Sequence, residues 1–265
     1  MKRLPRRLPR CVLAALLSLG GGLGAPISLA ELELDVLTEK TPITFRSRDN
    51  LADGQATELV QELIGQTGFD YNLYFVPWKR AYRRAESEAD VIIYPLARTS
   101  VREDKFHWIG QITPVHYYLF KLRERRDISV NSLDEINRYK VGVVNFHAHH
   151  VYLSSHGIDN VEQVNSNRQN FHKLLRKRVE LFASSSAGLL TLCEKEKVDC
   201  NKFEPVIKLE GISKGLYIAA SLDTDKNVLE QLKASYQRLE ENGSLAKIMG
   251  ERMNSPDEDR FLKTF

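Results

Sequence analysis

The chain has 265 residues, 42% of them hydrophobic and 28% charged, with three cysteines and a formal net charge of +3. This composition is typical of a globular protein of one or two domains and excludes a collagen-like chain, a disulfide-stapled miniprotein and a largely disordered chain. Residues 1–30 hold five basic residues and no acidic one, which leaves −2 for residues 31–265, so nothing draws that remainder towards nucleic acid or an anionic membrane.

The first thirty residues have the three regions of a secretory signal peptide. Residues 1–10 are basic, residues 11–19 form an apolar run, and Ser28-Leu29-Ala30 offers small residues at a cleavage site. The alternative is an N-terminal anchor helix, but the run is short for a hydrocarbon core of about 30 Å. We expect residues 1–30 to be removed during bacterial export, which places the mature protein in the periplasm.

Helical and strand patterns alternate almost throughout the rest of the chain. Strands are expected where apolar residues alternate with polar ones or form short buried runs, and helices where they recur every three or four residues. In chain order the predicted elements are a strand at 32–37, a helix at 57–64, a strand at 71–76, a helix at 78–85, strands at 91–94 and 115–122, a helical start at 132–135, a strand at 141–144, a helix at 168–176, a strand at 179–182, a helix at 185–195, a strand at 216–220 and a helix at 227–241. This order predicts an α/β protein with mainly parallel sheets.

Export also decides how the cysteines are interpreted. Removing Cys11 leaves Cys193 and Cys200, with six residues between them. An even pair in an oxidising compartment favours a disulfide, and the alternative is two partly buried thiols. The spacing is not that of a structural zinc site.

Short motifs occur along the chain in a set order: Gly54-Gln-Ala-Thr-Glu58-Leu59, Val76-Pro77-Trp78-x-Arg80-Ala81, Ala89-Asp90-Val91-Ile92, Thr99-x-x-Arg102 with Phe106-x-Trp108, Ser132-Leu133-Asp134-Glu135-Ile136 with Lys140-Val141-Gly142-Val143, and Leu216-Tyr217-Ile218-Ala219 before the last helix. Together with the signal peptide, this ordered set resembles the family 3 periplasmic solute-binding proteins of ABC importers, of the amino-acid-binding type. The resemblance covers roughly residues 33–252.

The resemblance implies a two-lobed, periplasmic binding protein-like fold. Each lobe is then a mainly parallel sheet flanked by helices, and two strands cross between the lobes, near 118–122 and 212–216. Lobe one is expected at 31–119 plus 217–265, and lobe two at 120–216. Ligands of such folds bind in a cleft at the carboxyl ends of strands, and hinge closure buries them.

The resemblance also points to ligand-binding residues. Arg102 corresponds to the arginine that grips a ligand carboxylate, which suits a planar guanidinium, although a surface arginine is the alternative. Thr99 supplies a hydroxyl or caps the following helix, and Trp78 stacks on the ligand or packs within its lobe. Arg80 faces the cleft or pairs with an acid, and Glu39 stands at the cleft rim as a candidate for a ligand cation.

The sequence departs from the family pattern where an α-ammonium would bind. Ser184 and Ser185 stand where an aspartate is expected, and a hydroxyl accepts a hydrogen bond without neutralising the charge. These serines either bind ligand or cap the helix that starts there. The second-lobe Gly-Thr anion loop is replaced by residues 145–148, Asn-Phe-His-Ala.

Three histidines of this loop region, His147, His149 and His150, form a cluster in the sequence. Such a cluster can bind Zn²⁺ or Ni²⁺, but no carboxylate stands within the motif, and solvated or ligand-facing histidines are the alternative. We therefore assign no metal site and no cofactor. The familiar motifs of serine hydrolases, zinc proteases and phosphate loops are absent from the sequence.

These observations predict a binding protein and not an enzyme. It would capture a small polar, carboxylate-bearing molecule, such as an amino acid or a relative, and deliver it to an ABC permease in the inner membrane. We expect a monomer without a nucleic-acid partner. The alternatives are a dehydratase-like enzyme on the same scaffold, which would place a carboxylate acid or base in the cleft, and a stand-alone sensing module for a membrane partner.

Overall fold

The structure is a computed structural model that describes residues 33–49 and 51–250. The predicted signal peptide at 1–30, and residues 31, 32 and 251–265 of the predicted first lobe, lie outside the described residues. Within the described ranges, no helix combines the length and the apolar character needed to span a lipid bilayer.

The first of two five-stranded sheets has the order β4-β1-β5-β12-β6. Its strands are β4 (Asp70–Phe75), β1 (Glu33–Thr38), β5 (Val91–Ala97), β12 (Leu216–Ala220) and β6 (His107–Thr113). The helices packed on it are α1 (Gln55–Gly65), α2 (Trp78–Ser87), α6 (Lys226–Glu241) and α7 (Ser244–Met249), and the 3₁₀ helix η1 (Ser100–Lys105) follows β5. A two-stranded ribbon pairs β2 (Phe45–Arg46) with β3 (Ala52–Asp53).

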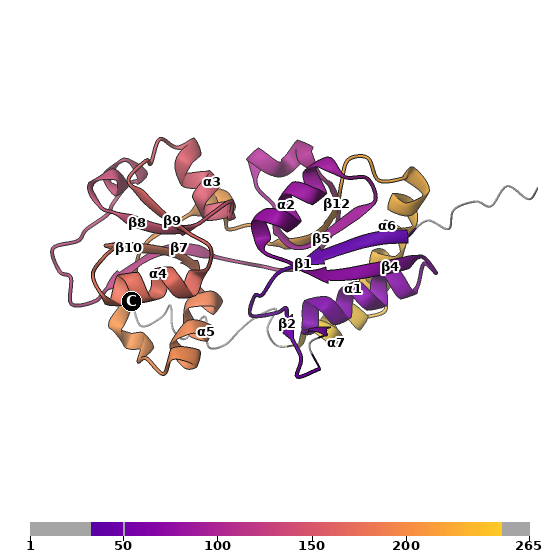
Figure 1. Cartoon of the computed structure of the whole chain (residues 1–265), viewed down its shortest axis with the longest axis horizontal. Helices are drawn as coiled ribbons and strands as arrows, with labels where there is room; N and C mark the ends of the chain where they lie inside the picture. The colour runs from indigo at the N-terminus through magenta and orange to yellow at the C-terminus, as the bar shows by residue number, and fades with distance from the viewer. Residues whose placement is uncertain (1–32, 50, 251–265) are drawn as a thin grey trace, which may run out of the picture. The chain divides into compact units, whose positions relative to one another are not determined.

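Both faces of the first sheet are covered because its strands carry apolar residues on both sides. In β1, Leu34 and Val36 join the core formed with α1, α6 and α7, whereas Leu37 joins the core formed with α2. Figure 1 shows α1 and α2 on opposite sides of this sheet. Strand β5 is buried at every position, as its continuous apolar run predicts for a central strand.

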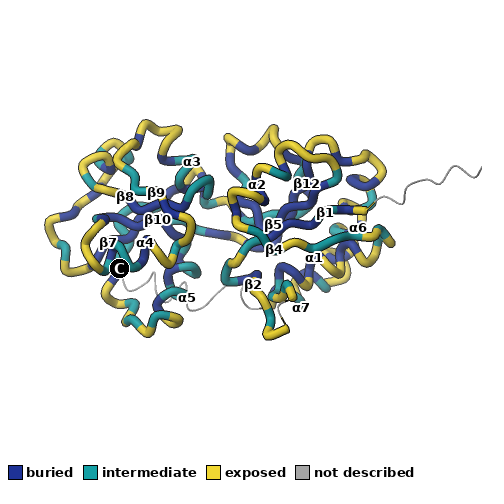
Figure 2. Tube along the Cα trace, viewed as in Figure 1, coloured by how far each residue is buried: buried dark blue, intermediate teal, exposed yellow. Residues whose placement is uncertain are grey.

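The second sheet has the order β11-β7-β10-β8-β9. Its strands are β11 (Phe203–Lys208), β7 (Tyr117–Leu122), β10 (Leu181–Ser185), β8 (Val141–Val144) and β9 (Val161–Val164). Helix α3 (Ala148–Ser155) and 3₁₀ helix η2 (Leu133–Arg138) contribute to one core of this sheet, and α4 (Asn167–Leu175) and α5 (Ser186–Glu196) contribute to the other. Strands β5 and β8 are buried at every position, as the dark tube in Figure 2 shows, whereas the edge strands β4, β9 and β11 are largely half-buried.

The sheets are mixed, which corrects the expectation of mainly parallel sheets. In the first sheet β1 pairs in parallel with β4 and β5, while β12 runs antiparallel to β5 and β6. In the second, β8 pairs in parallel with β9 and β10, while β7 runs antiparallel to β10 and β11. The antiparallel pairings arise at β7 and β12, the strands that begin just after the chain passes from one sheet to the other.

Every predicted helix and strand has a counterpart in the structure, with ends that differ by a few residues; the helical start at 132–135 becomes η2. The sequence patterns missed four longer elements, namely β6, α3, β9 and β11, together with the short elements α7, β2 and β3. The first sheet uses residues 33–113 and 216–220 and the second uses 117–208. The predicted lobe boundaries at 119/120 and 216/217 stay predictions.

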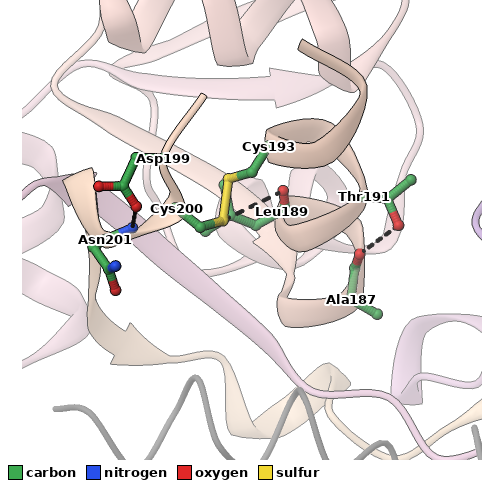
Figure 3. Close-up of a disulfide and its surroundings, with 7 residues drawn as sticks. All are labelled: Ala187, Leu189, Thr191, Cys193, Asp199, Cys200 and Asn201. Carbon is green, nitrogen blue, oxygen red and sulfur yellow. Dashed lines mark hydrogen bonds between the residues drawn. A yellow bond between two sulfur atoms is a disulfide. The ribbon is translucent and has the colours of Figure 1, made fainter. Parts of the chain in front are cut away.

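The predicted disulfide is present, between Cys193 near the end of α5 and Cys200 at the start of the 3₁₀ helix η3 (Cys200–Lys202). Figure 3 shows it tying the helix to the loop that follows it. Lys197, the left-handed residue that ends α5, turns the chain back so that the two Cα atoms lie 5.5 Å apart.

Candidate functional site

A cavity of about 120 Å³ is lined by residues from both sheets and their connections. It is well above the volume of about 10–15 Å³ that one water molecule needs, so it has room for several waters or a small ligand. Its lining residues are Glu39, Lys40, Thr41, Pro42, Trp78, Pro95, Ala97, Arg102, Val115, Tyr117, His147, Ala148, Asn167, Ser185, Gly188 and Leu216.

Arg102 is a buried cation in this lining, with 1% of its surface exposed. Its Nη1 donates to the Ala97 carbonyl at 3.1 Å, and its Nη2 donates to the Phe146 carbonyl at 2.9 Å. Its Nε is buried without a hydrogen-bond partner, and no carboxylate of the described residues lies within 4.0 Å of the guanidinium. Burial lowers the pKa of Arg102, because the surroundings disfavour the charged form of the guanidinium.

Aromatic rings surround this guanidinium. Its central carbon lies 4.9 Å from the ring centre of Tyr82 and 5.8 Å from that of Trp78. Tyr117 lines the same cavity, and burial raises the pKa of its hydroxyl to about 12, with Glu39 adding to the rise and Arg102 opposing it. The phenol therefore stays neutral over the physiological range, with its hydroxyl able to donate a hydrogen bond.

Glu39 and His147 form a second polar group in the lining. His147 Nε2 lies 3.2 Å from Glu39 Oε1, although the two are not aligned as a hydrogen bond. Both side chains are about one-fifth exposed. Glu39 is the single carboxylate among the lining residues.

The loop at 145–148 between β8 and α3 reaches the residues of the first sheet. The Phe146 carbonyl accepts from both Arg102 and the Trp78 indole, whose Nε1 lies 3.1 Å away. Phe146 has a φ of 62°, in the left-handed region that bulky residues rarely adopt. Its amide donates to His150 Nδ1 at 3.1 Å.

The other histidines are structural acceptors. His149 is 1% exposed, and its Nε2 accepts from the Val144 amide at 3.2 Å. Burial holds the pKa of His149 well below its usual value, and burial also lowers the pKa of His150. Among residues 33–49 and 51–250, no group of three potential metal ligands comes together.

The sequence matches no family model and no curated protein. Solved structures match over most of the chain. The substrate-binding protein of an amino acid ABC transporter superposes with a TM-score of 0.66, at 11% identity, over 84% of this chain and 99% of that one. A histidine kinase sensor domain with similarity to periplasmic binding proteins has a TM-score of 0.69, at 14% identity, over 82% and 93%.

A third match is an ancestral amino acid-binding protein described as a precursor of cyclohexadienyl dehydratase, with a TM-score of 0.64 and 13% identity over 82% of this chain and 92% of that one. The chain has the fold of the periplasmic amino-acid-binding proteins. At these identities the likeness establishes the fold, and what this binding-protein fold does here has to be argued from its cavity.

The cavity of the binding-protein fold gathers four of the residues singled out from the sequence, namely Arg102, Trp78, Glu39 and Ser185. Ser185 also caps α5, because its Oγ accepts from the Gly188 amide at 3.1 Å. The roles of these four residues towards a ligand stay predictions.

The other three singled-out residues do not line this cavity. Thr99 is buried at the start of η1, where its carbonyl accepts from the Arg102 amide. Ser184 is buried with its hydroxyl unpartnered, one position before the lining residue. Arg80 is exposed on α2 and lines a neighbouring depression.

Tyr117 and the backbone of Phe146 were not identified from the sequence. The loop at 145–148 was a visible departure from the family pattern, and the predicted strand at 115–122 is rich in aromatic residues; these are the signals that could have marked them. Neither feature, however, indicates which residues of the strand or loop line the ligand cavity.

Proposed function

We propose that this chain is an exported, periplasmic solute-binding protein that captures a small carboxylate-bearing molecule for an ABC importer. The observation that carries the proposal is Arg102: a buried arginine in a cavity wall, with no carboxylate of the described residues to neutralise it. Burying an unpaired charge is costly, and a folded protein retains it where a partner is to arrive from outside.

The hydrogen bonds of Arg102 leave room for such a partner. A guanidinium carries five N–H groups, and the Ala97 and Phe146 carbonyls accept from two of them. The Tyr82 hydroxyl also interacts with the guanidinium, and the buried Nε–H is left without an acceptor. A carboxylate accepting two parallel hydrogen bonds from this group satisfies both the charge and the unmade hydrogen bond.

The remaining walls favour a ligand with a flat or apolar body. Trp78, Tyr117 and His147 contribute rings, and Pro42, Val115 and Leu216 contribute apolar surface, as lining residues of the cavity. Aromatic walls recognise flat groups by stacking and apolar ones by burial. The ligand class is therefore a small carboxylate whose body fits a cavity of about 120 Å³.

A thermal-shift screen of the mature protein tests the proposal. The panel holds amino acids, their deaminated analogues, small aromatic and aliphatic carboxylates, and matched amides and alcohols without the carboxylate. A ligand at about 100 times its Kd adds about 2.7 kcal/mol of stability, which is a rise in Tm of several degrees. Stabilisation by carboxylates but not by their amides supports the proposal; stabilisation by cations or neutral sugars alone contradicts it.

Import and sensing use the same kind of cavity, and the likeness to a sensor domain keeps sensing as the second candidate. A deletion strain that no longer accumulates the identified ligand supports import, whereas normal accumulation with a lost transcriptional response supports sensing. The enzyme alternative would have to rely on Glu39, the single carboxylate in the cavity lining, with His147 beside it, and turnover of the bound ligand would identify it.

A further inference from the structure

Phe146 makes an unusual number of contacts across the two sheets for one half-buried loop residue. It follows β8 of the second sheet, yet its carbonyl accepts two hydrogen bonds from residues packed on the first sheet, one from Trp78 and one from Arg102. Its ring packs against the core cluster of the first sheet that contains Trp78 and Tyr82.

Two cationic side chains of α2 lie close to the ring of Phe146. Lys79 Nζ lies 5.2 Å and Arg83 Cζ 5.5 Å from the ring centre of Phe146. These residues are four apart on the helix, so they share one face. Both are exposed, and no carboxylate of the described residues lies within 4.0 Å of either. Their charges are therefore available to the aromatic face.

The backbone of Phe146 is held in place from its own side of the cavity. Its φ of 62° turns the carbonyl out of the loop, and the amide is fixed by His150 Nδ1. The next residue, His147, caps α3 and lines the cavity. The conformation that carries a backbone penalty is thus the one that presents the carbonyl to Arg102 and Trp78.

We infer that Phe146 is a positioning residue that latches the second-sheet loop onto the ligand-gripping side chains of the first sheet. Its carbonyl orients Arg102 and Trp78, and its ring, held by Lys79 and Arg83, keeps the carbonyl there. We call this set of contacts the Phe146 latch. Its importance for ligand binding rests on the proposed function, but the contacts themselves can be tested without any ligand.

The latch predicts how binding and closure are linked. When it forms, Arg102 keeps its unpartnered Nε–H for a ligand, now in a fixed orientation. When it opens, Arg102 and Trp78 lose an acceptor at the same moment, since both donate to one oxygen. Ligand affinity therefore depends on a residue whose side chain need not touch the ligand, through the fraction of molecules that are latched.

The two tryptophans of the chain provide a direct measurement. The indole N–H of Trp78 donates to Phe146, across the two sheets, whereas that of Trp108 donates to the Glu103 carbonyl at 3.1 Å, close by in the same chain segment. In ¹⁵N-labelled, ligand-free protein the exchange rate of each indole hydrogen with solvent can be followed separately. Trp108 is then an internal control for global unfolding.

Replacing Phe146 by alanine removes the ring but keeps a residue that prefers negative φ. We expect the Trp78 indole hydrogen to exchange roughly tenfold faster in Phe146→Ala, because two cation–π contacts are lost, and the Trp108 hydrogen to change less than twofold. The double variant Lys79→Ala/Arg83→Ala, at exposed positions that cannot unfold a core, should shift Trp78 in the same direction. Lys233→Ala, exposed on α6, is the matched control and should shift neither.

An unchanged Trp78 exchange rate in both Phe146→Ala and the double variant would overturn the inference. Equal acceleration of both tryptophans would also overturn it, because it would show general loosening. If Trp78 responds as expected while no carboxylate stabilises the protein, the latch is supported and the proposed ligand class alone fails. In the presence of a carboxylate found by the screen, Phe146→Ala should raise the dissociation rate, and the Lys233→Ala control should not.

Discussion

Replacing Arg102 by methionine separates the effect of this residue on the free energy of unfolding from its effect on ligand affinity. Methionine fills the volume of the arginine stem but removes the buried charge and its two hydrogen bonds. We expect the Tm of the ligand-free protein to stay about level, because removing a buried charge without a carboxylate partner is offset by the Ala97 carbonyl that loses its donor. Binding of a carboxylate ligand should weaken by about 2–5 kcal/mol, measured by calorimetry.

Arg98→Met is the matched control for this variant. Arg98 is partly exposed, is paired with Glu103 and does not line the cavity. It should bind ligand like the original protein, with a small loss of stability because surface pairs contribute little. Normal carboxylate affinity in Arg102→Met would remove Arg102 from the proposed site.

His149 should make the protein less stable in mild acid. Burial, followed by the charges of His147 and His150, holds the pKa of His149 well below the usual 6.5, so the folded protein keeps this ring neutral while the unfolded chain binds a proton. The contribution of a neutral His149 to the free energy of unfolding is therefore fully present above about pH 6.5. As the pH drops below that value, the free energy of unfolding decreases by at most about 1.4 kcal/mol per pH unit for one histidine.

Urea denaturation at pH 7.5 and 5.5 measures this dependence. In His149→Phe the loss of stability on acidification should be smaller than in the original protein, because the group that must stay neutral is gone. His156→Gln, at an exposed position, should keep the full loss. Equal losses in all three proteins would show that other groups cause the acid sensitivity.

At the scale of elements, the packing of α6 on β6 depends on Gly110. A Cβ at this position would lie 2.2 Å from the ring of Tyr236, whose hydroxyl donates to the neighbouring Gln111 carbonyl at 2.7 Å. We expect Gly110→Ala to lower the free energy of unfolding by about 1–3 kcal/mol, because the helix must move away from the strand.

Gly65 near the end of α1 provides the opposite case. A Cβ there meets no atom within 4 Å, so Gly65→Ala adds no clash and restricts the unfolded chain. We expect it to raise stability by about 0.5–1 kcal/mol. Chemical denaturation of Gly110→Ala and Gly65→Ala measures both changes in the free energy of unfolding. A stabilising effect of Gly110→Ala would contradict the close approach of α6 to β6.

The disulfide ties α5 to the loop that enters β11. Its cysteines are seven positions apart, and closing so short a loop restricts the unfolded chain by about 2 kcal/mol. We expect Cys193→Ala/Cys200→Ala, or reduction of the original protein, to lower stability by roughly that amount. Intact mass after alkylation is the check: both thiols reacting under denaturing conditions without reductant would show that the exported protein lacks the bond.

At the scale of the whole molecule, ligand specificity depends on whether an ammonium finds a partner when the cavity closes. Ser184 does not line the cavity and Ser185 caps α5, so neither serine replaces the charge of the expected aspartate. Glu39, close to His147, is the remaining acid. We expect simple α-amino acids to bind less well than their deaminated analogues, since a buried unpaired ammonium costs several kcal/mol.

Calorimetry with glutamine or arginine and their deaminated analogues measures this preference, with Glu39→Gln as the diagnostic variant. If the deaminated analogues bind better and Glu39→Gln changes neither affinity much, the expectation holds. Tighter binding of the amino acids, lost in Glu39→Gln, would contradict it and assign the ammonium to Glu39.

The sequence by itself determined the α/β class, most of the elements and the export and disulfide hypotheses. The reason is that burial imposes local periods: the apolar run of β5 predicts a central strand, and the spacing of Val228, Leu232 and Leu239 predicts the buried face of α6. Where local periodicity is weak, as in β6 with its Gly110 and Gln111, the strand forms through its pairing with the distant strand β12 and the burial of Ile109 and Ile112 in the core.

Only the tertiary structure decided which candidate residues share a cavity. Arg102 and Trp78 reach it from one sheet, while Tyr117 and His147 come from segments of the other, and no sequence period links these positions. The tertiary structure also decided that the Phe146 carbonyl accepts hydrogen bonds from both Trp78 and Arg102, although every residue has a backbone carbonyl. A backbone acceptor has no signature in the sequence, because its role depends on where the fold places it and not on the identity of its side chain.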